Sequence, residues 1–229
     1  MKRFLVALLV IVPLSGAAGR EQKKFYIQGI TLSTGAVWSR YSELPRVATI
    51  PEIRGVLGNN TGAVAGVALE AHLSDHIMID SGLQYVRKGT AVNWYYFDEP
   101  GGKWVYNLDM LSFPVTYRFK PLSRSSPYIL AGYELSIIDH HHQTDFTGAL
   151  GPVKTDLAEQ TKDIDLGFIA GVGAELVFKK WTPFVEFRYH IGLLNISKGT
   201  GPLESYPTIR TRALVLLAGI RFRLKRDAL

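Results

Sequence analysis

The chain has 229 residues, of which 47% are hydrophobic and 20% charged, and these values exclude a disordered or fibrous protein. It has no cysteine, which excludes disulfides, thiolate metal sites, cysteine nucleophiles and a lipid-modified amino-terminal cysteine. A formal net charge of +6 is a mild excess and gives no reason to expect nucleic acid as a partner. The 11 Tyr, 11 Phe, 4 Trp and 22 Gly favour β structure with many turns.

The first residues, MKRFLVALLVIVPLSGAAG, have the features of an export signal. A basic start precedes an apolar run over 4–14, which is too short to span a bilayer comfortably as an anchor helix, the alternative interpretation. Small residues then predict cleavage after Ala18 or Gly19. We therefore expect a signal peptide over 1–18 and one exported domain over 19–229, which has no apolar run near the length of a membrane-spanning helix.

Alternating apolar residues mark the first strands of the mature chain. Segments 24–38, 61–73 and 77–88 alternate imperfectly, so their boundaries carry an error of about two to four residues. The alternation is cleaner in 106–119 and 127–138. In 106–119, Leu111, Phe113, Val115, Tyr117 and Phe119 alternate with Met110, Ser112, Pro114, Thr116 and Arg118.

The clearest strand is DIDLGFIAGVGAELVF at residues 163–178. One parity is apolar throughout, whereas the other carries Asp165, Glu175 and three glycines, a pattern that a helix would scatter around its surface. Its 16 residues exceed the usual five or six of a soluble-protein strand and suit a tilted strand that crosses a bilayer, which needs about nine to eleven. Segment 182–196 alternates in the same way.

The last segment, 210–224, contains eight consecutive apolar residues followed by Arg221 and Arg223. A short apolar run by itself is equally compatible with a buried helix. The flanking alternation favours a strand, with Leu214, Leu216, Ala218, Ile220, Phe222 and Leu224 facing lipid and the arginines facing a lumen.

The connections between these eight segments alternate between short and long. Short turns lie at 74–76, 120–126 and 179–181, and long loops lie near 39–60, 89–105, 139–162 and 197–209. Short turns at one end and long loops at the other are typical of a transmembrane barrel. The sequence therefore predicts an all-β fold, an eight-stranded antiparallel up-and-down transmembrane β-barrel whose narrow interior is filled by its own side chains.

Charged residues of the inward parity must pair inside such a lumen or reach water, because an isolated buried charge costs several kcal/mol. The turn at 179–181 brings Glu175 and Glu186 together, and Arg221 and Arg223 reach the same level, so we predict that these four form one cluster. One interpretation of this predicted cluster is a polar plug that blocks the lumen. The alternative is a gated path or a catalytic acid–base group. The predicted lumen carries Glu70, Asp80, Glu134, Asp165, Glu175, Glu186, Arg118, Arg188, Arg221 and Arg223, with His72 and His190.

Two features of the loops suggest further roles. His140, His141 and His142 in DHHHQTD are weak candidates for a Zn²⁺, Cu²⁺ or Ni²⁺ site, because neighbouring residues converge on one ion only with an irregular backbone. An exposed polar loop is the alternative. Aromatic residues near the strand ends predict interfacial belts, formed by Trp38, Tyr41, Trp94 to Phe97, Trp104 and Tyr106 at the loop end and by Phe119, Phe178, Trp181 and Phe222 at the turn end.

The strands resemble the PorT-like outer membrane protein β-barrel family of Gram-negative bacteria. The resemblance covers essentially the mature chain and is carried by LDMLSFPVTYRF at 108–119, SPYILAGYE at 126–134, DIDLGFIAGVGAELVF at 163–178 and FRYHIGLLNI at 187–196. Met110 and Ser112 stand where the family usually has Tyr and Glu. The end GIRFRL is similar to the signal that the outer-membrane assembly machinery reads, although Leu217 and the tail KRDAL depart from it. The resemblance implies an outer-membrane location and an accessory role in protein secretion.

We expect a non-enzymatic outer-membrane protein with a plugged lumen and no cofactor, in contact with outer-membrane lipid, lipopolysaccharide, the assembly machinery and proteins that dock at loops or turns. The alternatives are a lipid-modifying enzyme, such as a lipid A deacylase or acyltransferase, a narrow porin-type channel and a soluble lipocalin-like barrel. The enzyme needs a serine–histidine pair, and Ser197 lies poorly placed for any inward histidine. A soluble barrel needs polar outward faces, which 163–178 lacks.

Overall fold

A computed structural model describes residues 26–43, 53–74, 76–121, 126–147, 151–200 and 208–224. The predicted signal peptide over 1–18 and the tail KRDAL lie outside the described residues. The elements are β1 (Tyr26–Tyr41), β2 (Ile53–Ser74), β3 (Ile77–Tyr96), β4 (Glu99–Phe119), β5 (Pro127–Asp145), β6 (Val153–Asp156), the 3₁₀ turn η1 (Ala158–Gln160), β7 (Ile164–Glu175), β8 (Trp181–Gly192) and β9 (Thr211–Arg223).

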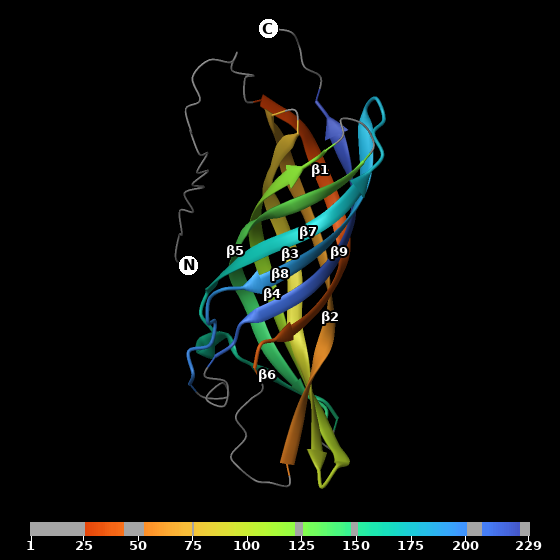
Figure 1. Ribbon diagram of the computed structural model, residues 1–229. Coiled ribbons are helices and arrows are strands. Elements are labelled where there is room, and N and C mark those ends of the chain that lie inside the picture. The colour runs from red at the N-terminus through yellow and green to blue at the C-terminus, as the bar shows by residue number, and fades with distance from the viewer. Residues whose placement is uncertain are drawn as a thin grey trace.

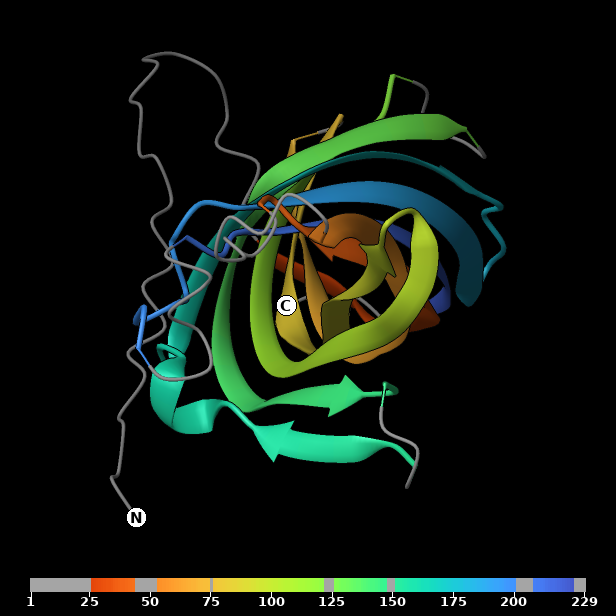
Figure 2. The same cartoon turned by 90° about the horizontal axis from the view of Figure 1, so that it is seen from below.

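Eight of the strands close into an antiparallel ring. Each pairs with its neighbour in the order β1–β2–β3–β4–β5–β7–β8–β9, and β9 pairs back with β1 through Gly29 to Tyr41. The four-residue β6 pairs with the end of β5, and this hairpin flares to one side of the ring (Figure 2). The predicted eight-stranded barrel is therefore confirmed, with β6 as a small addition.

Period-2 alternation decides which face of each strand is buried. In β9, Ala213, Val215 and Leu217 are buried in the lumen, whereas Leu214 and Leu216 are exposed on the outer wall. The apolar run at 213–220 is thus part of a strand and not a helix, as the flanking alternation predicted. In β8, Phe184, Glu186, Arg188 and His190 face inward between the exposed Val185, Phe187 and Tyr189.

The connection expected as a long loop over 89–105 is instead a continuation of β3 and β4. Their ladder runs on to the pair Tyr96↔Glu99, and a two-residue turn at Phe97 and Asp98 joins them. Both turn residues have positive φ, 48° and 66°, as a tight hairpin turn of the type that matches strand twist requires. The prediction failed because the outward face beyond residue 88 is no longer apolar, so the hydrophobic alternation fades although the backbone pairing continues.

Together with the first seven residues of β2, this hairpin forms a three-stranded extension that projects beyond the ring at the loop end (Figure 1). We call it the β2–β4 extension, defined as residues 53–59 and 90–106, including the turn at Phe97 and Asp98. Strand β1 reaches only the pair Ser39↔Asn60, so β2 residues 53–59 pair with β3 alone among the described residues. The third predicted loop, 139–162, is also partly regular, because β5 continues to Asp145 and β6 and η1 follow.

The aromatic residues at the loop end do not all form an interfacial belt. Tyr41, Trp94 and Tyr106 are buried in the lumen, at 1%, 4% and 1% exposure, because each lies on the inward parity of its strand. Trp38 is exposed on the outer wall, as the belt prediction requires, whereas Tyr96 and Phe97 are exposed at the end of the β3–β4 hairpin, beyond the ring. At the turn end the four predicted residues, Phe119, Phe178, Trp181 and Phe222, are all exposed.

The outer wall is apolar over the middle of the ring. On β4 the outward residues from Leu111 to Phe119 are apolar, and on β9 those from Leu214 to Phe222 are apolar. No helix in the described ranges has the length and hydropathy needed to cross a membrane.

Candidate functional site

The candidate site is a cluster of buried charged side chains in the lumen, at the turn end of the barrel. Arg118 of β4 is 1% exposed and forms ion pairs with Glu70 of β2, Asp80 of β3 and Glu175 of β7, the last over 3.3 Å. Glu70 and Asp80 are direct neighbours across β2 and β3, so their carboxylates would repel without a shared cation. The guanidinium fork of Arg118 bridges them, because it donates from Nε and Nη2 to Asp80 and from Nη2 to Glu70.

Arg221 of β9 forms the second centre of this cluster. Its Nη1 lies 2.7 Å from Glu175 and its Nη2 lies 2.7 Å from Glu186. Nη2 also donates to the Tyr128 hydroxyl over 2.9 Å, and that hydroxyl donates to Glu186 over 2.6 Å. The guanidinium lies 3.8 Å from the centre of the Phe184 ring, a close cation–π contact.

The structure thus brings together three of the four residues predicted to cluster, Glu175, Glu186 and Arg221. The fourth, Arg223, is exposed at the end of β9, and no ion pair between described residues includes it. Arg188 instead supplies the second cation of Glu186, with Nη2 and Oε2 2.5 Å apart. The expectation for Arg223 was wrong because the barrel mouth ends at the level of Arg221, so the next inward position already meets solvent.

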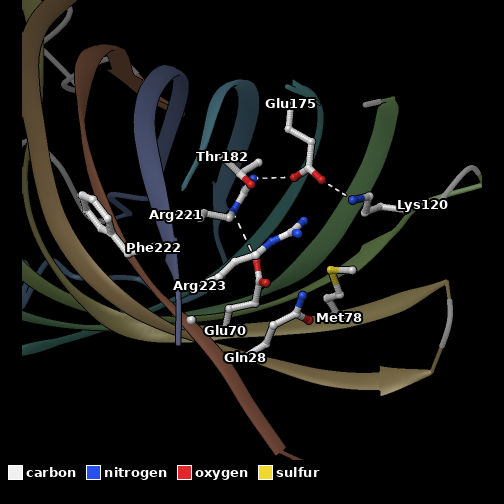
Figure 3. Close-up of a pocket in the computed structure, with 10 residues that line it drawn as sticks. Gln28, Glu70, Met78, Lys120, Glu175, Thr182, Arg221, Phe222 and Arg223 are labelled. Carbon is white, nitrogen blue, oxygen red and sulfur yellow. Dashed lines mark hydrogen bonds and ion pairs between the residues drawn. The ribbon is translucent and has the colours of Figure 1, made fainter. Parts of the chain in front are cut away.

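A small cavity lies at this mouth (Figure 3). Its volume of about 20 Å³ has room for about one water molecule. Two of the lining residues carry a polar atom without a hydrogen-bond partner within the described ranges, namely Gln28 Oε1 and Thr182 Oγ1. One ordered water would satisfy such atoms. The lining residues are Gln28, Gly29, Glu70, Met78, Lys120, Glu175, Thr182, Arg221, Phe222 and Arg223.

Two residues of the cluster were not anticipated from the sequence. Lys120, one residue beyond β4, pairs with Glu175, and Tyr128 of β5 links Arg221 to Glu186. Tyr128 has space because Gly173 lies opposite it on β7, where a Cβ atom would approach the ring to 2.5 Å. The inward location of Tyr128 could have been predicted from its parity in segment 127–138. Lys120 could not, because it belonged to a predicted turn.

A second ionic group lies deeper in the lumen. Lys88 Nζ of β3 contacts Glu134 Oε1 of β5 over 2.5 Å, and both side chains are essentially unexposed. Glu134 Oε2 lies 3.0 Å from His190 Nδ1 of β8. Asp165, also buried, accepts a hydrogen bond from the Thr211 hydroxyl over 3.2 Å. Lys88 was missed because the predicted strand ended there, although it shares the parity of Asp80.

Apolar layers alternate with the ionic groups along the lumen, and the larger one lies at the loop end. One layer consists of Val37, Val64, Val86, Ala213, Val215 and Leu217. A second, larger layer consists of Tyr41, Val92, Trp94, Tyr106, Leu108, Met110, Leu157, Ile196 and Ile209. Buried side chains therefore occupy successive levels of the described lumen, which along β3 run from the ionic Asp80 through Val86 and the ionic Lys88 to Val92 and Trp94.

The three consecutive histidines do not converge on one point. A register shift at Asp139, between the pairs Met110↔Ile138 and Asp109↔His140, reverses the alternation of β5, so that His141 is unexposed in the lumen and His140 is exposed on the outer side. His141 Nε2 lies 2.8 Å from the Tyr41 hydroxyl and its Nδ1 2.6 Å from the Thr161 hydroxyl. No group of three possible metal ligands occurs within the described ranges. The metal hypothesis required the three rings to converge, whereas the paired strand that follows the shift at Asp139 places His140 and His141 on opposite faces.

His141 lies beyond the apolar part of β5, one position past the outward pair Asp109↔His140. Burial lowers the pKa of His141 to about 4, with a smaller contribution from His142. At neutral pH the imidazole is therefore uncharged and joins two hydroxyl groups, which is a structural role.

Comparison with known proteins agrees with this architecture. A family model described as an outer membrane protein beta-barrel domain matches residues 29–198. No curated protein matches the sequence closely enough to count as a relative.

Solved structures similar to this chain include three outer-membrane barrels. Neisserial surface protein A, NspA, is 15% identical, with 85% of this chain and 97% of that chain covered and a TM-score of 0.45. Ail, the attachment invasion locus protein of Yersinia pestis, is 14% identical over 86% of this chain and 100% of that chain, with a TM-score of 0.44. The outer membrane protease OmpT of Escherichia coli is 9% identical over 88% of this chain and 98% of that chain, with a TM-score of 0.44. These likenesses concern the fold and assign no activity to this chain.

Proposed function

Because the chain belongs to the outer membrane protein beta-barrel domain family and lies in the outer membrane, we propose that it is a closed, non-enzymatic barrel that holds the β2–β4 extension outside the cell for contact with a protein partner. The observation that carries this proposal is the filled lumen. A barrel whose interior is occupied by ion pairs and apolar layers serves as a rigid support and leaves contact with partners to its ends.

The ionic layer supports closure because it is built from mutually dependent pairs. Arg118 and Arg221 each contact several carboxylates contributed by different strands, so opening a path would separate several buried ions at once. Breaking one buried pair costs about 3–5 kcal/mol, far above thermal energy. The apolar layer around Trp94 and Tyr106 adds a second barrier, because ions do not cross a dry hydrocarbon layer.

The chemistry of the extension supports a protein partner. At its tip, the Phe97 side chain is 77% exposed and the Tyr96 side chain is 48% exposed. Neither of them belongs to the apolar core of the lumen. Beside them, Tyr95, Pro100 and Phe146 line a surface hollow of about 400 Å³. Exposed aromatic side chains beside a hollow are the composition of protein-binding hot spots. Long loops and extended strands lie on the extracellular side of such barrels.

Electrical recording tests the closed lumen. We expect flat current traces from the purified protein in planar bilayers. A variant with Arg118→Ala and Arg221→Ala serves as the positive control for a loosened plug, provided it remains folded on an unheated gel. Steady single-channel steps from the unmodified protein would contradict the closed barrel and favour the porin-type channel.

Surface labelling and partner capture test the extension. A Phe97→Ser, Tyr96→Ser variant is expected to fold normally and to lose cross-linking to outer partners, whereas a Lys154→Gln variant at the neighbouring β5–β6 hairpin keeps it. Equal cross-linking in both variants would move the contact away from the extension.

Unchanged lipopolysaccharide on gels from deletion and overexpression strains is expected, and altered acylation would favour the lipid-modifying enzyme.

The PorT-like resemblance of segments 108–119 and 163–178 supports a more specific role as an accessory of protein secretion. In that role a deletion strain retains secreted proteins inside the cell, and a complementing gene restores their export. Normal export in the deletion strain would remove this specific role while leaving the closed barrel intact. The proposed signal peptide is tested by amino-terminal sequencing of the mature protein, with a start at position 19 or 20 expected.

A further inference from the structure

We propose that three arginines on the outer wall, Arg40, Arg210 and Arg212, bind the phosphate of an outer-leaflet glycolipid at the junction of β1 and β9. The lipid's acyl chain would lie along the apolar wall below them. This site is independent of the docking role of the β2–β4 extension, which lies at residues 53–59 and 90–106.

The level of the three arginines corresponds to the border of the apolar wall. On β9 the outward residues are apolar from Phe222 to Leu214, and Arg212 is the next outward residue. On β3 and β4 the same border is marked by Arg87 and Asp109, which are direct register partners. Charged side chains at this border lie among lipid headgroups, because the hydrocarbon region excludes them.

The arginines are arranged as a group of like charges. Arg40 and Arg212 are direct register partners on adjacent strands, and both are exposed on the outer wall. Arg210 is exposed two residues further along the same face, where its carbonyl accepts a hydrogen bond from Ser42 N over 2.9 Å. Like charges directly opposite on neighbouring strands destabilise a sheet. A bound anion removes that repulsion.

At the same border of the apolar wall, on β3 and β4, an arginine is paired with a carboxylate of the chain itself. Arg87 Nε lies 2.6 Å from Asp109 Oδ1, and the Tyr85 hydroxyl donates to the same oxygen over 2.7 Å. None of the ion pairs between described residues provides such a carboxylate for Arg40 or Arg212. The guanidinium groups at the β1–β9 junction thus present a fork that matches phosphate geometry.

The wall directly below the arginines is suited to the rest of a lipid. Trp38 and Leu214 are direct register partners two residues towards the turn end, and Tyr189 of β8 lies opposite Leu214. All three are between 38% and 40% exposed, and amphipathic rings at this depth are typical of the headgroup border.

Further down the same strands, an apolar groove of about 450 Å³ crosses β2, β1 and β9. Its lining includes the large side chains of Leu32 and Ile220 and the small side chains of Thr34, Ala65 and Ala218. Thr34 and Ala218 are register partners six residues from the pair Arg40↔Arg212, a distance of about 20 Å along a strand. A phosphate held at the arginines therefore places an acyl chain in reach of the groove. This continuity of charge, aromatic border and groove favours a phosphorylated lipid over a soluble anion.

Native mass spectrometry of the purified barrel tests the site, with phosphorylated lipid A as the probe and enzymatically dephosphorylated lipid A as its matched counterpart. We expect the unmodified protein to retain phosphorylated lipid A, and an Arg40→Gln, Arg212→Gln variant to bind it at least tenfold more weakly. A Lys103→Gln, Lys154→Gln variant removes the same charge from exposed positions elsewhere at the loop end and should bind as the unmodified protein does.

Five outcomes would overturn the proposal. Equal binding by the arginine variant, or equal loss in the lysine variant, would show that these arginines are not the site. Equal binding of dephosphorylated lipid A would show that phosphate is not recognised. Displacement of the lipid by millimolar inorganic phosphate would assign the arginines to a free anion, and a lower thermal transition of the arginine variant in lipid-free detergent would indicate a partner within the chain itself.

Discussion

The buried pair Lys88–Glu134 allows the energetics of the lumen to be tested sharply. Its two charges are 2.5 Å apart with side-chain exposures of 0% and 1%, so water does not screen them. Replacing Lys88 by Met leaves Glu134 with His190 alone, and replacing Glu134 by Leu leaves a buried ammonium group without its carboxylate. Each single change should lower the free energy of unfolding by about 3–5 kcal/mol, the usual cost of leaving a buried ion unpaired.

The double variant Lys88→Met, Glu134→Leu should be far less destabilised than the sum of the singles. Replacing both ions by apolar side chains of similar size removes the desolvation cost together with the attraction, and such exchanges are commonly neutral or stabilising. Because His190 then loses the carboxylate that it contacts among the described residues, we expect a residual loss of about 0–2 kcal/mol instead of the roughly 6–10 kcal/mol of additive behaviour.

Urea unfolding of protein refolded into lipid vesicles, followed by tryptophan fluorescence, measures these differences. The band shift between heated and unheated gel samples reports independently whether each variant folds. Lys154→Met on the exposed face of β6 is the control and should change stability by less than about 0.5 kcal/mol. Additive losses in the double variant would refute the view that the two side chains are charged and paired in the lumen.

Three further predictions follow from the same structure. Glu175→Gln weakens contacts with three cations at the turn end and should lower the temperature at which the folded gel band is lost, whereas an unchanged transition would mean that these pairs do not stabilise the barrel. The folded-state pKa of His141, about 4, lies below its ordinary 6.5, so the unfolded chain takes up the proton first and stability should fall by up to about 3 kcal/mol as pH drops from about 6.5 to 4. His141→Gln should flatten this pH profile and His140→Gln should not, and a profile that both variants leave unaltered would assign it elsewhere. A spin label at Leu216 should report acyl chains and one at Phe97 water, and water at both positions would contradict the membrane orientation.

The face of each strand was readable from the sequence because it depends only on a local rule. In a strand, neighbouring side chains point to opposite sides, so the apolar parity of segments such as 163–178 and 182–196 identified the outer wall directly. The inward location of Glu134, Asp165 and Glu186 followed from the same rule, without knowledge of any partner.

The partners themselves could not be read in this way. Arg118 meets Glu175 across the lumen, 57 positions along the chain, and Lys88 meets Glu134 at a separation of 46 positions, so each contact depends on strand register and ring closure together. The same limit explains the wrong expectation for Arg223, whose parity was inward but whose position lay past the end of the lumen.

The extent of the strands was also decided by tertiary structure. Beyond residue 88 the extension keeps its backbone ladder without an apolar outer face, so hydrophobic alternation no longer marks the strand. Likewise, the register shift at Asp139 together with the continued pairing of β5 turned His141 inward and separated it from His140, and neither can be read from the local sequence. The sequence by itself determined which side chains avoid water, since that preference belongs to each residue and its parity. The closed ring of strands decided which charges meet, because distance through space is set by register and closure and by no local property of the chain.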